Sequence, residues 1–379
     1  MTNNQLQLTN CPTDKRYWIG FNLVKGIGAV RLQALLNHFG DLALAWQAPA
    51  DALQAAGLSL RLAERVIQIR AGVNLDKILA QIAAQGIGII TWEDELYPPR
   101  LKEIDQPPPV LYVRGNLTTD DTWAVAVVGT RRVSAYGRQV TEELAAFLAV
   151  NGVTVVSGLA RGVDAIAHQS ALKNGGRTIA VLGCGVDRIY PPEHKPLAEK
   201  VIANGALISD YAPGTPPDAS NFPPRNRIIS GLAMATVVVE AGETSGALIT
   251  AQFAVDQGRE VFAVPGNILA PQSKGTNRLI AQGAHPMLSA RDLLDVLNLG
   301  RVTEQRSVRR ALPGDEFETK LMNVLTHEPL HLDDIRNLTG LPIERVSATL
   351  VMMELKGLVR QVGGNNYVAV REEQSEYKA

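Results

Sequence analysis

Residues 123–158 read WAVAVVGTRRVSAYGRQVTEELAAFLAVNGVTVVSG, and this stretch decides the fold. A short run of apolar, mostly β-branched residues stands near each end, at 124–128 and 153–156. Such continuous apolar runs are typical of strands that are covered on both faces of a sheet. Residues 137–152 between them have apolar residues at helical spacing. A strand, a helix and a second strand in this order predict two parallel strands joined by a helix.

The same rhythm continues to about residue 300. The runs TIAVLG, ALISD, ATVVVEAG and EVFAVPG begin at residues 178, 206, 235 and 260, and almost every run ends in Gly, Ser or Asp. Helical patterns separate most of them. The chain therefore predicts an α/β fold with a Rossmann-like, doubly wound parallel sheet and helices on both faces.

Smaller regions flank this pattern, and we expect four parts in all. Residues 1–75 read as a small helical domain of the SAM or helix-hairpin-helix type, 76–300 as the extended Rossmann-like domain, 301–315 as a basic linker and 316–372 as a winged-helix domain. The last prediction rests on three helical patterns followed by a hairpin with a Gly-Gly-Asn-Asn turn. The turn at Lys25–Gly28 weakly resembles hairpins whose backbone N–H groups face a phosphate, although a packed helical module without a ligand is the more common meaning of such a pattern.

Composition limits the classes of function. The chain has 379 residues and a net charge of −1, so any contact with nucleic acid must come from a local basic patch. Its two cysteines, Cys11 and Cys184, exclude a disulfide framework and a multi-cysteine zinc site. The polar N-terminus lacks a signal peptide, and no apolar run is long enough to span a bilayer. We expect a cytoplasmic protein with no metal and no membrane contact.

The chemistry of an open parallel sheet lies in the loops that follow the carboxyl ends of its strands. Here these loops are rich in Gly, and they carry much of the basic charge of the domain: Arg131, Arg132, Arg161, Arg188, Arg225, Arg227, Lys274 and Arg278. Glycine-rich turns and helix starts present backbone N–H groups to anions, and arginine binds phosphate through two hydrogen bonds. The loops therefore predict a site for a phosphate ester or a chain of them.

The motifs disfavour the common nucleotides. GCGVDR has Arg188 where the dinucleotide fingerprint needs its third Gly, and GETSGA lacks the spacing and the Lys of a Walker A loop. We expect no cofactor. Basic residues spread over several loops suit an extended polyanion, and single-stranded nucleic acid needs a positive groove with rings for base stacking. Phe222, Tyr136, Tyr190 and Tyr211 could supply such rings, or could serve as ordinary packing.

The stretch FPPRNR, residues 222–227, is the strongest candidate for a phosphate clamp. We expect Pro223 and Pro224 to hold an extended segment, because proline fixes φ near −65°. In an extended segment Arg225 and Arg227 would point the same way, and a helix would begin after them. Asn226 would hold the loop or meet a base. The alternative is that both arginines form internal salt bridges to carboxylates such as Asp218 or Glu240.

Evidence for a catalytic set is weak, and we expect no enzyme. Asp164 and His168 lie four apart on one helical face, which permits acid-base chemistry but more often serves structure. There is no nucleophile-elbow motif and no cluster with metal-ligand spacing. Glu240, at the end of a strand, is the best single acid, and Ser245 reads as a helix cap.

Six stretches together resemble the DNA-processing protein A family (DprA, also called Smf): GTRRVSAYG, SGLARGVDAIAH, VLGCGVDRIYP, FPPRNRIISGLA, VVVEAGETSGALITAQFAVDQGREVFAVPG and GTNRLI with its following GA, in order across residues 129–284. The resemblance implies a protein that binds single-stranded DNA in natural transformation, protects incoming DNA, loads the RecA recombinase and dimerises through the Rossmann-like domain. Carried over by motif, with Arg132 beside the first group, the DNA-binding residues would be Gly129, Thr130, Arg131, Arg132, Ser157, Gly158, Arg161, Gly162, Phe222, Arg225, Asn226, Arg227, Lys274 and Asn277.

Two other functions stay open. The sheet and the loop EAGETSGALIT are similar to those of phosphoribohydrolases that bind nucleotides, but the Pro and one Gly of their P-G-G-x-G-T run are absent. A regulator that senses a nucleotide and contacts duplex DNA through the winged helix is the third reading. Release of free base from a nucleoside monophosphate would identify the enzyme.

Overall fold

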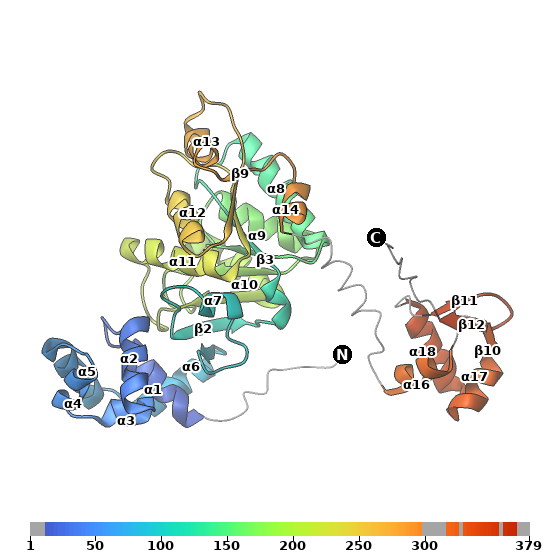
Figure 1. The fold of residues 1–379 in the computed structure, drawn as a ribbon, viewed down its shortest axis with the longest axis horizontal. Coiled ribbons are helices and arrows are strands. Elements are labelled where there is room, and N and C mark those ends of the chain that lie inside the picture. Colours follow the sequence, from blue (N-terminus) through green and yellow to red (C-terminus); the bar gives the residue numbers. More distant parts are fainter. Residues whose placement is uncertain (1–11, 298–315, 326–328, 356–358, 370–379) are drawn as a thin grey trace, which may run out of the picture. The chain divides into compact units, whose positions relative to one another are not determined.

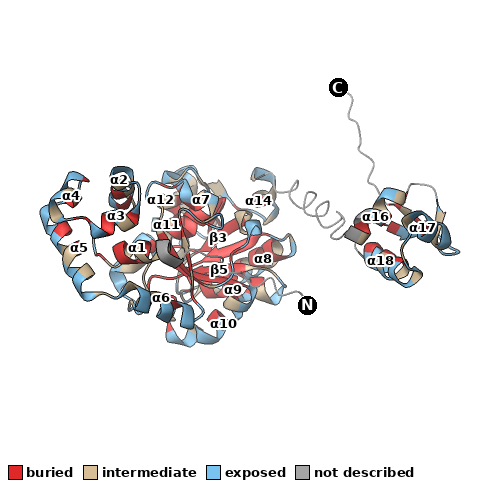
Figure 2. Cartoon of the chain, turned by 90° about the horizontal axis from the view of Figure 1, so that it is seen from below, coloured by how far each residue is buried: buried red, intermediate tan, exposed pale blue. Residues whose placement is uncertain are grey.

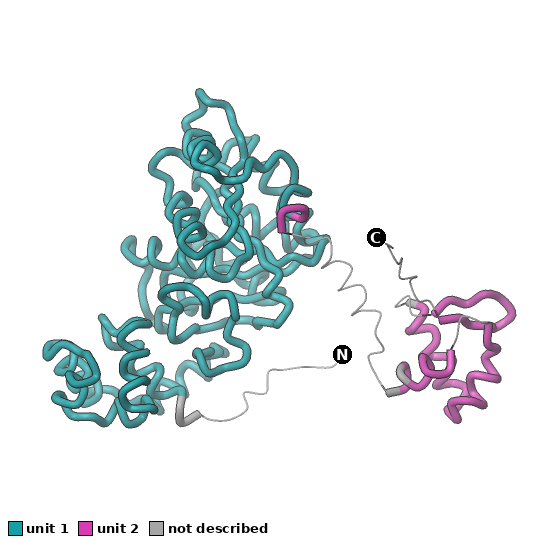
Figure 3. Tube along the Cα trace, viewed as in Figure 1, with its two compact units in different colours: residues 1–293 teal, residues 294–379 magenta. Residues whose placement is uncertain are grey.

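The computed structural model describes residues 12–297, 316–325, 329–355 and 359–369. They fall into two compact units, residues 1–293 and 294–379, which Figure 3 colours separately. The expected basic linker, 301–315, lies outside the described residues. The boundary expected after residue 75 falls at the start of helix α6, Leu75–Ala84, inside the first unit, and it stays a prediction.

A mostly parallel sheet forms the centre of the first unit (Figure 1). Six strands are parallel to one another: β3 Ala124–Val128, β4 Thr154–Ser157, β5 Thr178–Val181, β6 Gly205–Ser209, β7 Ala235–Val238 and β8 Glu260–Ala263. Val125 pairs with Val155 on one side and Ala235 on the other. The doubly wound α/β fold expected from the apolar runs is confirmed.

Three further strands extend this sheet to the order β1-β2-β6-β5-β4-β3-β7-β8-β9. β1 (Gly88–Thr91) and β2 (Val110–Gly115) are antiparallel additions beside β6, and the short β9 (His285–Pro286) is parallel to β8. Strands β4 to β6 lie on one side of β3, and β7 and β8 lie on the other. The winding therefore reverses between β3 and β7, which is where such folds open a crevice at the carboxyl edge.

Helices cover both faces of the sheet, and the strands between them are buried (Figure 2). On one face, α8 packs on α9 and α9 on α10; on the other, α11 packs on α12 and on the short α7. Their bounds are α7 Pro99–Lys102, α8 Ala135–Val150, α9 Val163–Lys173, α10 Lys195–Asn204, α11 Phe222–Leu232 and α12 Gly246–Asp256. Two later helices, α13 Lys274–Ala281 and α14 Arg291–Val296, follow β8 and β9.

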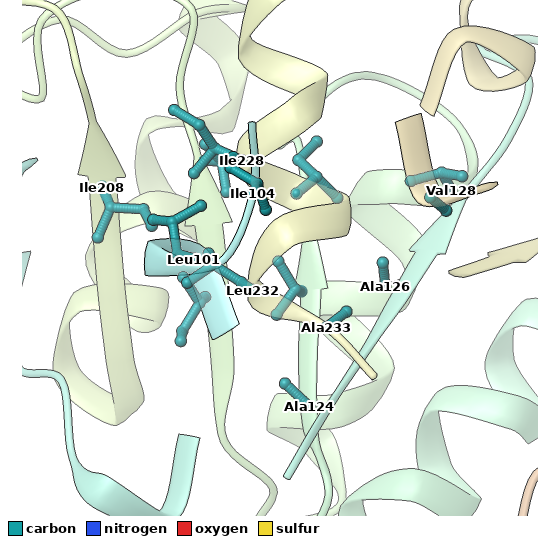
Figure 4. Packing of buried hydrophobic residues seen from close by; sticks show 14 of the residues in the cluster. Leu101, Ile104, Ala124, Ala126, Val128, Ile208, Ile228, Leu232 and Ala233 are labelled. Carbon is teal, nitrogen blue, oxygen red and sulfur yellow. The ribbon is translucent and has the colours of Figure 1, made fainter. Parts of the chain in front are cut away.

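The apolar contact between α11 and the sheet fixes the position of α11 (Figure 4). Ile228 and Leu232 of α11 belong to one buried cluster with Leu101 of α7 and with the alternate β3 residues Ala124 and Ala126. A Cβ atom on Gly231 would come within 2.8 Å of Leu101 Cδ1, so glycine is needed for this close approach. The start of α11 is thereby held at the carboxyl edge of the sheet.

The N-terminal helices form the expected helical module. They are α1 Pro12–Asn22, α2 Ala29–Phe39, α3 Leu42–Gln47, α4 Ala50–Ala55, α5 Leu60–Gly72 and α6. Their core, which includes Trp18 and Phe21, continues into Tyr112 of β2 and Val186 of the loop after β5. The module therefore shares its core with one edge of the sheet. No helix in the described part of the chain is long and apolar enough to cross a membrane.

The second unit contains the expected winged helix. Three helices precede a hairpin: α16 Glu316–Val324, α17 Leu332–Thr339, α18 Ile343–Leu355, β11 Val359–Gln361 and β12 Asn366–Ala369. β10 (Leu330–His331) pairs with β12, which gives the sheet order β10-β12-β11. This unit has an apolar cluster of its own, with Leu321, Ile335 and Leu350 fully buried.

Candidate nucleic-acid interface

Helix α11 begins at Phe222, so the extended clamp predicted for residues 222–227 is wrong. Pro223 and Pro224 lie in the first turn, where the missing N–H groups have no intrahelical acceptor in any case. Residues two apart on a helix point in nearly opposite directions. Arg225 and Arg227 therefore diverge. The alternative of an internal salt bridge applies to Arg227, whereas Arg225 donates to backbone carbonyls.

Arg225 is buried beneath the carboxyl edge, with 4% of its surface exposed. Its Nη1 donates to the carbonyl of Gly158 at 2.9 Å and to the carbonyl of Val181. A Cβ atom on Gly158 would lie 2.7 Å from Arg225 Nη2 and 2.8 Å from Asp164 Oδ2, so the two charged groups flank this glycine. Burial lowers the pKa of Arg225, while the Asp164 charge opposes that shift. Arg225 ties the ends of β4 and β5 to α11.

Arg227 points toward the loop after β6. Its Nη2 donates to Asp210 Oδ2 at 2.9 Å, and about a fifth of each side chain is exposed. The backbone carbonyl of Arg227 accepts a 3.0 Å hydrogen bond from the side chain of Gln257. Neither Asp218 nor Glu240, the carboxylates named above as alternatives, is its partner. Arg227 is an internal ion-pair residue in this structure.

Three side chains gather at the carboxyl edge and are here called the Phe222 site: Arg131, Tyr190 and Phe222. The Arg131 guanidinium lies 5.9 Å from the centre of the Phe222 ring, and the Tyr190 ring centre lies 5.6 Å from it. Arg131 and Tyr190 are exposed, and Phe222 is half-buried. A Cβ atom on Gly183 would approach the ring to 2.9 Å, so this glycine lets the ring lie against the backbone after β5. The site offers a cation and aromatic surfaces together.

The buried Arg225 supports this ring from the protein side. Its guanidinium lies 5.8 Å from the centre of the Phe222 ring. Two cations near one aromatic ring are favourable because the ring face is electron-rich. Of the two, Arg131 is accessible to a ligand and Arg225 is not. The orientation of Phe222 is therefore set before any ligand arrives.

The loops after β3 and β4 pack on each other rather than forming an open cradle. Gly162 has φ +78°, and a Cβ atom there would come within 2.3 Å of the Thr130 carbonyl. The Val163 amide donates to that same carbonyl at 3.2 Å. Ser157 is fully buried, and its hydroxyl donates to the Val127 carbonyl. Gly129, too, is in close contact, since a Cβ atom there would meet Val163 at 2.6 Å. These residues hold the Arg131 backbone in place.

The crevice between β3 and β7 is filled by a carboxylate of the chain itself. Glu240 is buried, and its two oxygens accept from the Ser134 amide at 2.9 Å and from the Ser134 hydroxyl. Ser134 is the N-cap of α8, where a bound pyrophosphate would otherwise meet the helix. A Cβ atom on Gly137 would collide with the same carboxylate. The Glu240 carboxylate thus occupies the position at the start of α8 where a ligand phosphate would bind, and Ser134 holds it there.

The remaining expected residues lie in separate loops. Arg132 is exposed, Arg161 forms a surface ion pair with Glu193, and Lys274 Nζ lies 4.0 Å from Glu243. Two asparagines serve the backbone. Asn277 exchanges hydrogen bonds with both the amide and the carbonyl of Gly266, and Asn226 donates to the Gly246 carbonyl at 3.3 Å. The three cations lie at the surface, with Arg161 held by Glu193, whereas the asparagines fix loops.

Asp164 and His168 are structural, as the more common reading of this spacing indicates. Asp164 accepts hydrogen bonds from the amides of Gly158 and Ala160. His168 is fully buried, contacts the Thr178 hydroxyl at 2.6 Å through Nδ1, and has no described partner at Nε2. Burial lowers the pKa of His168 to about 3, so the ring is neutral at physiological pH. Within the described ranges no group of His, Cys, Asp and Glu could hold a metal ion.

Sequence reasoning missed two features of the site. Gly183 was read only as part of a failed dinucleotide fingerprint, although a Gly directly after a strand can also signal close approach of a ring. Asp210 was not considered as the partner of Arg227. The residues 218–221, DASN, do contain a signal for a helix start before Phe222, because Asp218 caps the short 3-10 helix Ala219–Asn221.

Comparison with known proteins supplies relatives over most of the chain. Residues 88–298 match the family model described as DNA recombination-mediator protein A, and residues 305–365 match the DprA winged helix domain. Protein Smf of Synechocystis sp. is 37% identical over 392 residues, covering 94% of this chain and 98% of that protein. Protein Smf of Escherichia coli is 38% identical over 363 residues, covering 90% and 95%.

Two solved structures are similar in fold. The X-ray structure of DNA processing protein A from Streptococcus pneumoniae has a TM-score of 0.65 and 35% identity, covering 74% of this chain and 97% of that chain. A structure of DNA processing protein A from Helicobacter pylori, which concerns that protein's single-stranded DNA binding mode, has a TM-score of 0.50 and 31% identity, covering 55% and 95%.

Proposed function

The chain belongs to the DNA recombination-mediator protein A family, and on that premise we propose that it binds single-stranded DNA at the Phe222 site and delivers the strand to a RecA-type recombinase. One observation carries the proposal: Phe222 and Tyr190 lie beside the exposed Arg131 at the carboxyl edge of the sheet. Stacking rings next to an accessible cation suit a flexible strand, whose bases are unpaired and whose phosphates are close by.

The residues at the edge divide into two roles in this proposal. Arg131, Arg132, Arg161 and Lys274 contact phosphates, because all four side chains are exposed; Arg161 exchanges its surface ion pair with Glu193 for a phosphate. Phe222 and Tyr190 receive a base. The other predicted residues do not contact the strand and instead fix the loops that present these groups. They are Gly129, Thr130, Ser157, Gly158, Gly162, Arg225, Asn226, Arg227 and Asn277. A site that is already fixed loses less entropy on binding than a mobile one.

Related proteins support the choice of ligand. The Helicobacter pylori protein binds single-stranded DNA, and it covers more than half of this chain. A duplex is a poorer ligand for the Phe222 site, because its bases are stacked on each other and cannot lie on a protein ring. Binding rather than catalysis is the proposed activity, since Glu240, the strongest candidate acid, is held by Ser134.

The wider role follows from the family and stays a proposal. We expect the protein to act in the cytoplasm, to protect incoming DNA during natural transformation and to load RecA on it. We also expect two copies to associate through the Rossmann-like domain. Helix α12 exposes Ile249 and Val255, at 40% and 58%, and apolar side chains of this kind suit a protein contact.

A salt titration tests the proposal. Binding of a fluorescent oligothymidine should weaken linearly on a log-log plot against salt, and Arg131→Ala should reduce the slope by about 0.7, which is the loss of one phosphate contact. The matched control is Arg138→Ala, an exposed arginine of α8 that lies 3.7 Å from Glu142. Equal slopes for the wild type and Arg131→Ala would contradict the assignment, as would tighter binding of a duplex of the same length.

A further inference from the structure

The turn at Lys25–Gly28 and the start of helix α5 form a second cationic surface, here called the hairpin surface: Lys25, Arg31, Arg61 and Arg65. Two hydrogen bonds bring these residues together. Arg65 Nη1 donates to the Lys25 carbonyl at 2.7 Å, and Arg31 Nη1 donates to the Gly26 carbonyl at 2.6 Å. Arg61 lies one helical turn before Arg65 on α5, so both face the same side.

No described carboxylate forms an ion pair with these four side chains. Lys25, Arg31 and Arg61 are exposed, and Arg65 is half-buried. Glu64, the only acid on α5, makes no ion pair with them either. By contrast, Arg161 and Arg227 of the sheet domain have carboxylate partners. In a chain of net charge −1, four cations gathered without an ion-pair partner among the described residues repel one another and favour an anionic ligand.

The hairpin surface lies beside the segment that leads into the Phe222 site. Asn22, at the end of α1, donates to the Asp210 carbonyl at 3.3 Å and accepts from the Tyr112 hydroxyl at 3.0 Å. Asp218 has a lowered pKa, mainly through hydrogen bonds from the side chain and backbone of Ser220, and Lys25 is close enough for its charge to contribute. Four residues after Asp218 comes Phe222.

We propose that the hairpin surface is a second binding site for the sugar-phosphate backbone of the strand held at the Phe222 site. The proposal rests on the proposed function and extends it to the N-terminal module. Its exposed large apolar neighbours include Val30 and Leu60, at 68% and 54%, and no aromatic side chain belongs to the surface. It therefore contacts phosphates rather than bases, and it is reached only by a strand long enough to leave the Phe222 site.

Oligonucleotide length separates the two sites experimentally. The double variant Lys25→Gln, Arg61→Gln removes two charges whose side chains make no hydrogen bond with described residues, so the turn stays intact. Oligothymidines of about 6 and about 25 nucleotides bracket the span of one compact site. We expect unchanged binding of the short strand. For the long strand the salt slope should fall by about 1.4, for two lost phosphate contacts, and affinity at low salt should fall about tenfold.

Controls distinguish the failure of each claim. Lys77→Gln, an exposed lysine on α6, should bind both lengths like the wild type. If Arg131→Ala weakens the short strand but the double variant matches the wild type on the long strand, the hairpin surface is not a strand site. If the double variant weakens only duplex binding, the surface serves a duplex and the inferred continuity is wrong. If Arg131→Ala has no effect on the short strand, the proposed function itself fails.

Discussion

Arg131 and Arg225 carry the same guanidinium group and lie within 6 Å of the same phenylalanine ring, but their surroundings separate their roles. Arg131 is exposed, whereas Arg225 is buried and donates to backbone carbonyls from two strands. Burying a cation without such partners would lower the stability of the folded state, so the hydrogen bonds of Arg225 are needed for folding. The difference comes from the position of each residue on its element and not from its chemistry.

We predict that Arg225→Ala destabilises the protein by about 3–5 kcal/mol, because it leaves the buried Asp164 without its neighbouring cation and leaves carbonyls unpaired. Arg131→Ala, a change at an exposed site, should alter the free energy of unfolding by less than about 0.5 kcal/mol. Urea unfolding of both variants measures this. If Arg225→Ala unfolds like the wild type but no longer binds DNA, Arg225 contacts the DNA directly and its structural role is wrong.

The buried His168 makes stability depend on pH. Its pKa is about 3 in the folded protein against 6.5 in the unfolded chain, because burial disfavours the charged ring. Below pH 6.5 the unfolded state binds the extra proton, so stability is complete above that pH and falls as the pH drops toward 3. At pH 5 the loss from this residue should be about 2 kcal/mol. In His168→Gln the difference in unfolding free energy between pH 7.5 and pH 5 should shrink by this amount; an unchanged difference would count against a neutral buried ring.

At the scale of elements, the sequence predicts strands with a regular apolar pattern well, but it does not predict where an element that contains prolines begins. The run at 124–128 is apolar throughout and the run at 235–238 contains Thr236 as its one polar residue; such short runs are typical of a strand buried on both faces, and both strands formed there. The start of α11 was misjudged because two prolines suit either an extended segment or a first helical turn. Tertiary contacts decide between an extended segment and a helical turn. Ile228 and Leu232 pack α11 on the sheet, and the helix begins at Phe222.

The start of α8 depends on Ser134, and its contribution can be isolated. Ser134→Ala removes the cap bond from the Gly137 amide and one hydrogen bond to the buried Glu240. We expect a loss of about 1–3 kcal/mol and faster amide exchange in the first turn of α8. Ser134→Thr keeps the hydroxyl and should retain most of the protection. Wild-type exchange rates in the alanine variant would show that the Ser134 hydroxyl does not stabilise the start of this helix.

For the whole molecule, the fold class and the edge of the sheet at which Arg131 and Phe222 lie could be predicted, but the contacts that these residues make could not. Parallel strands place their following loops at one edge whatever the side chains are, so Arg131 and Phe222 were expected there. Gly183 under the Phe222 ring and Asp210 beside Arg227 are contacts between segments 39 and 17 residues apart. Such contacts depend on the packing of several loops at once, and no local pattern reports them.

Photocrosslinking on the intact protein tests the central claim most directly. A single-stranded oligonucleotide carrying 5-iodouracil, irradiated with the protein and mapped by mass spectrometry, should crosslink to Phe222 and Tyr190, because a base that stacks on these rings is in contact with them. Arg131→Ala should lower the yield at both positions without moving them. Crosslinks confined to the winged-helix unit, or absent from the carboxyl edge of the sheet, would contradict the account.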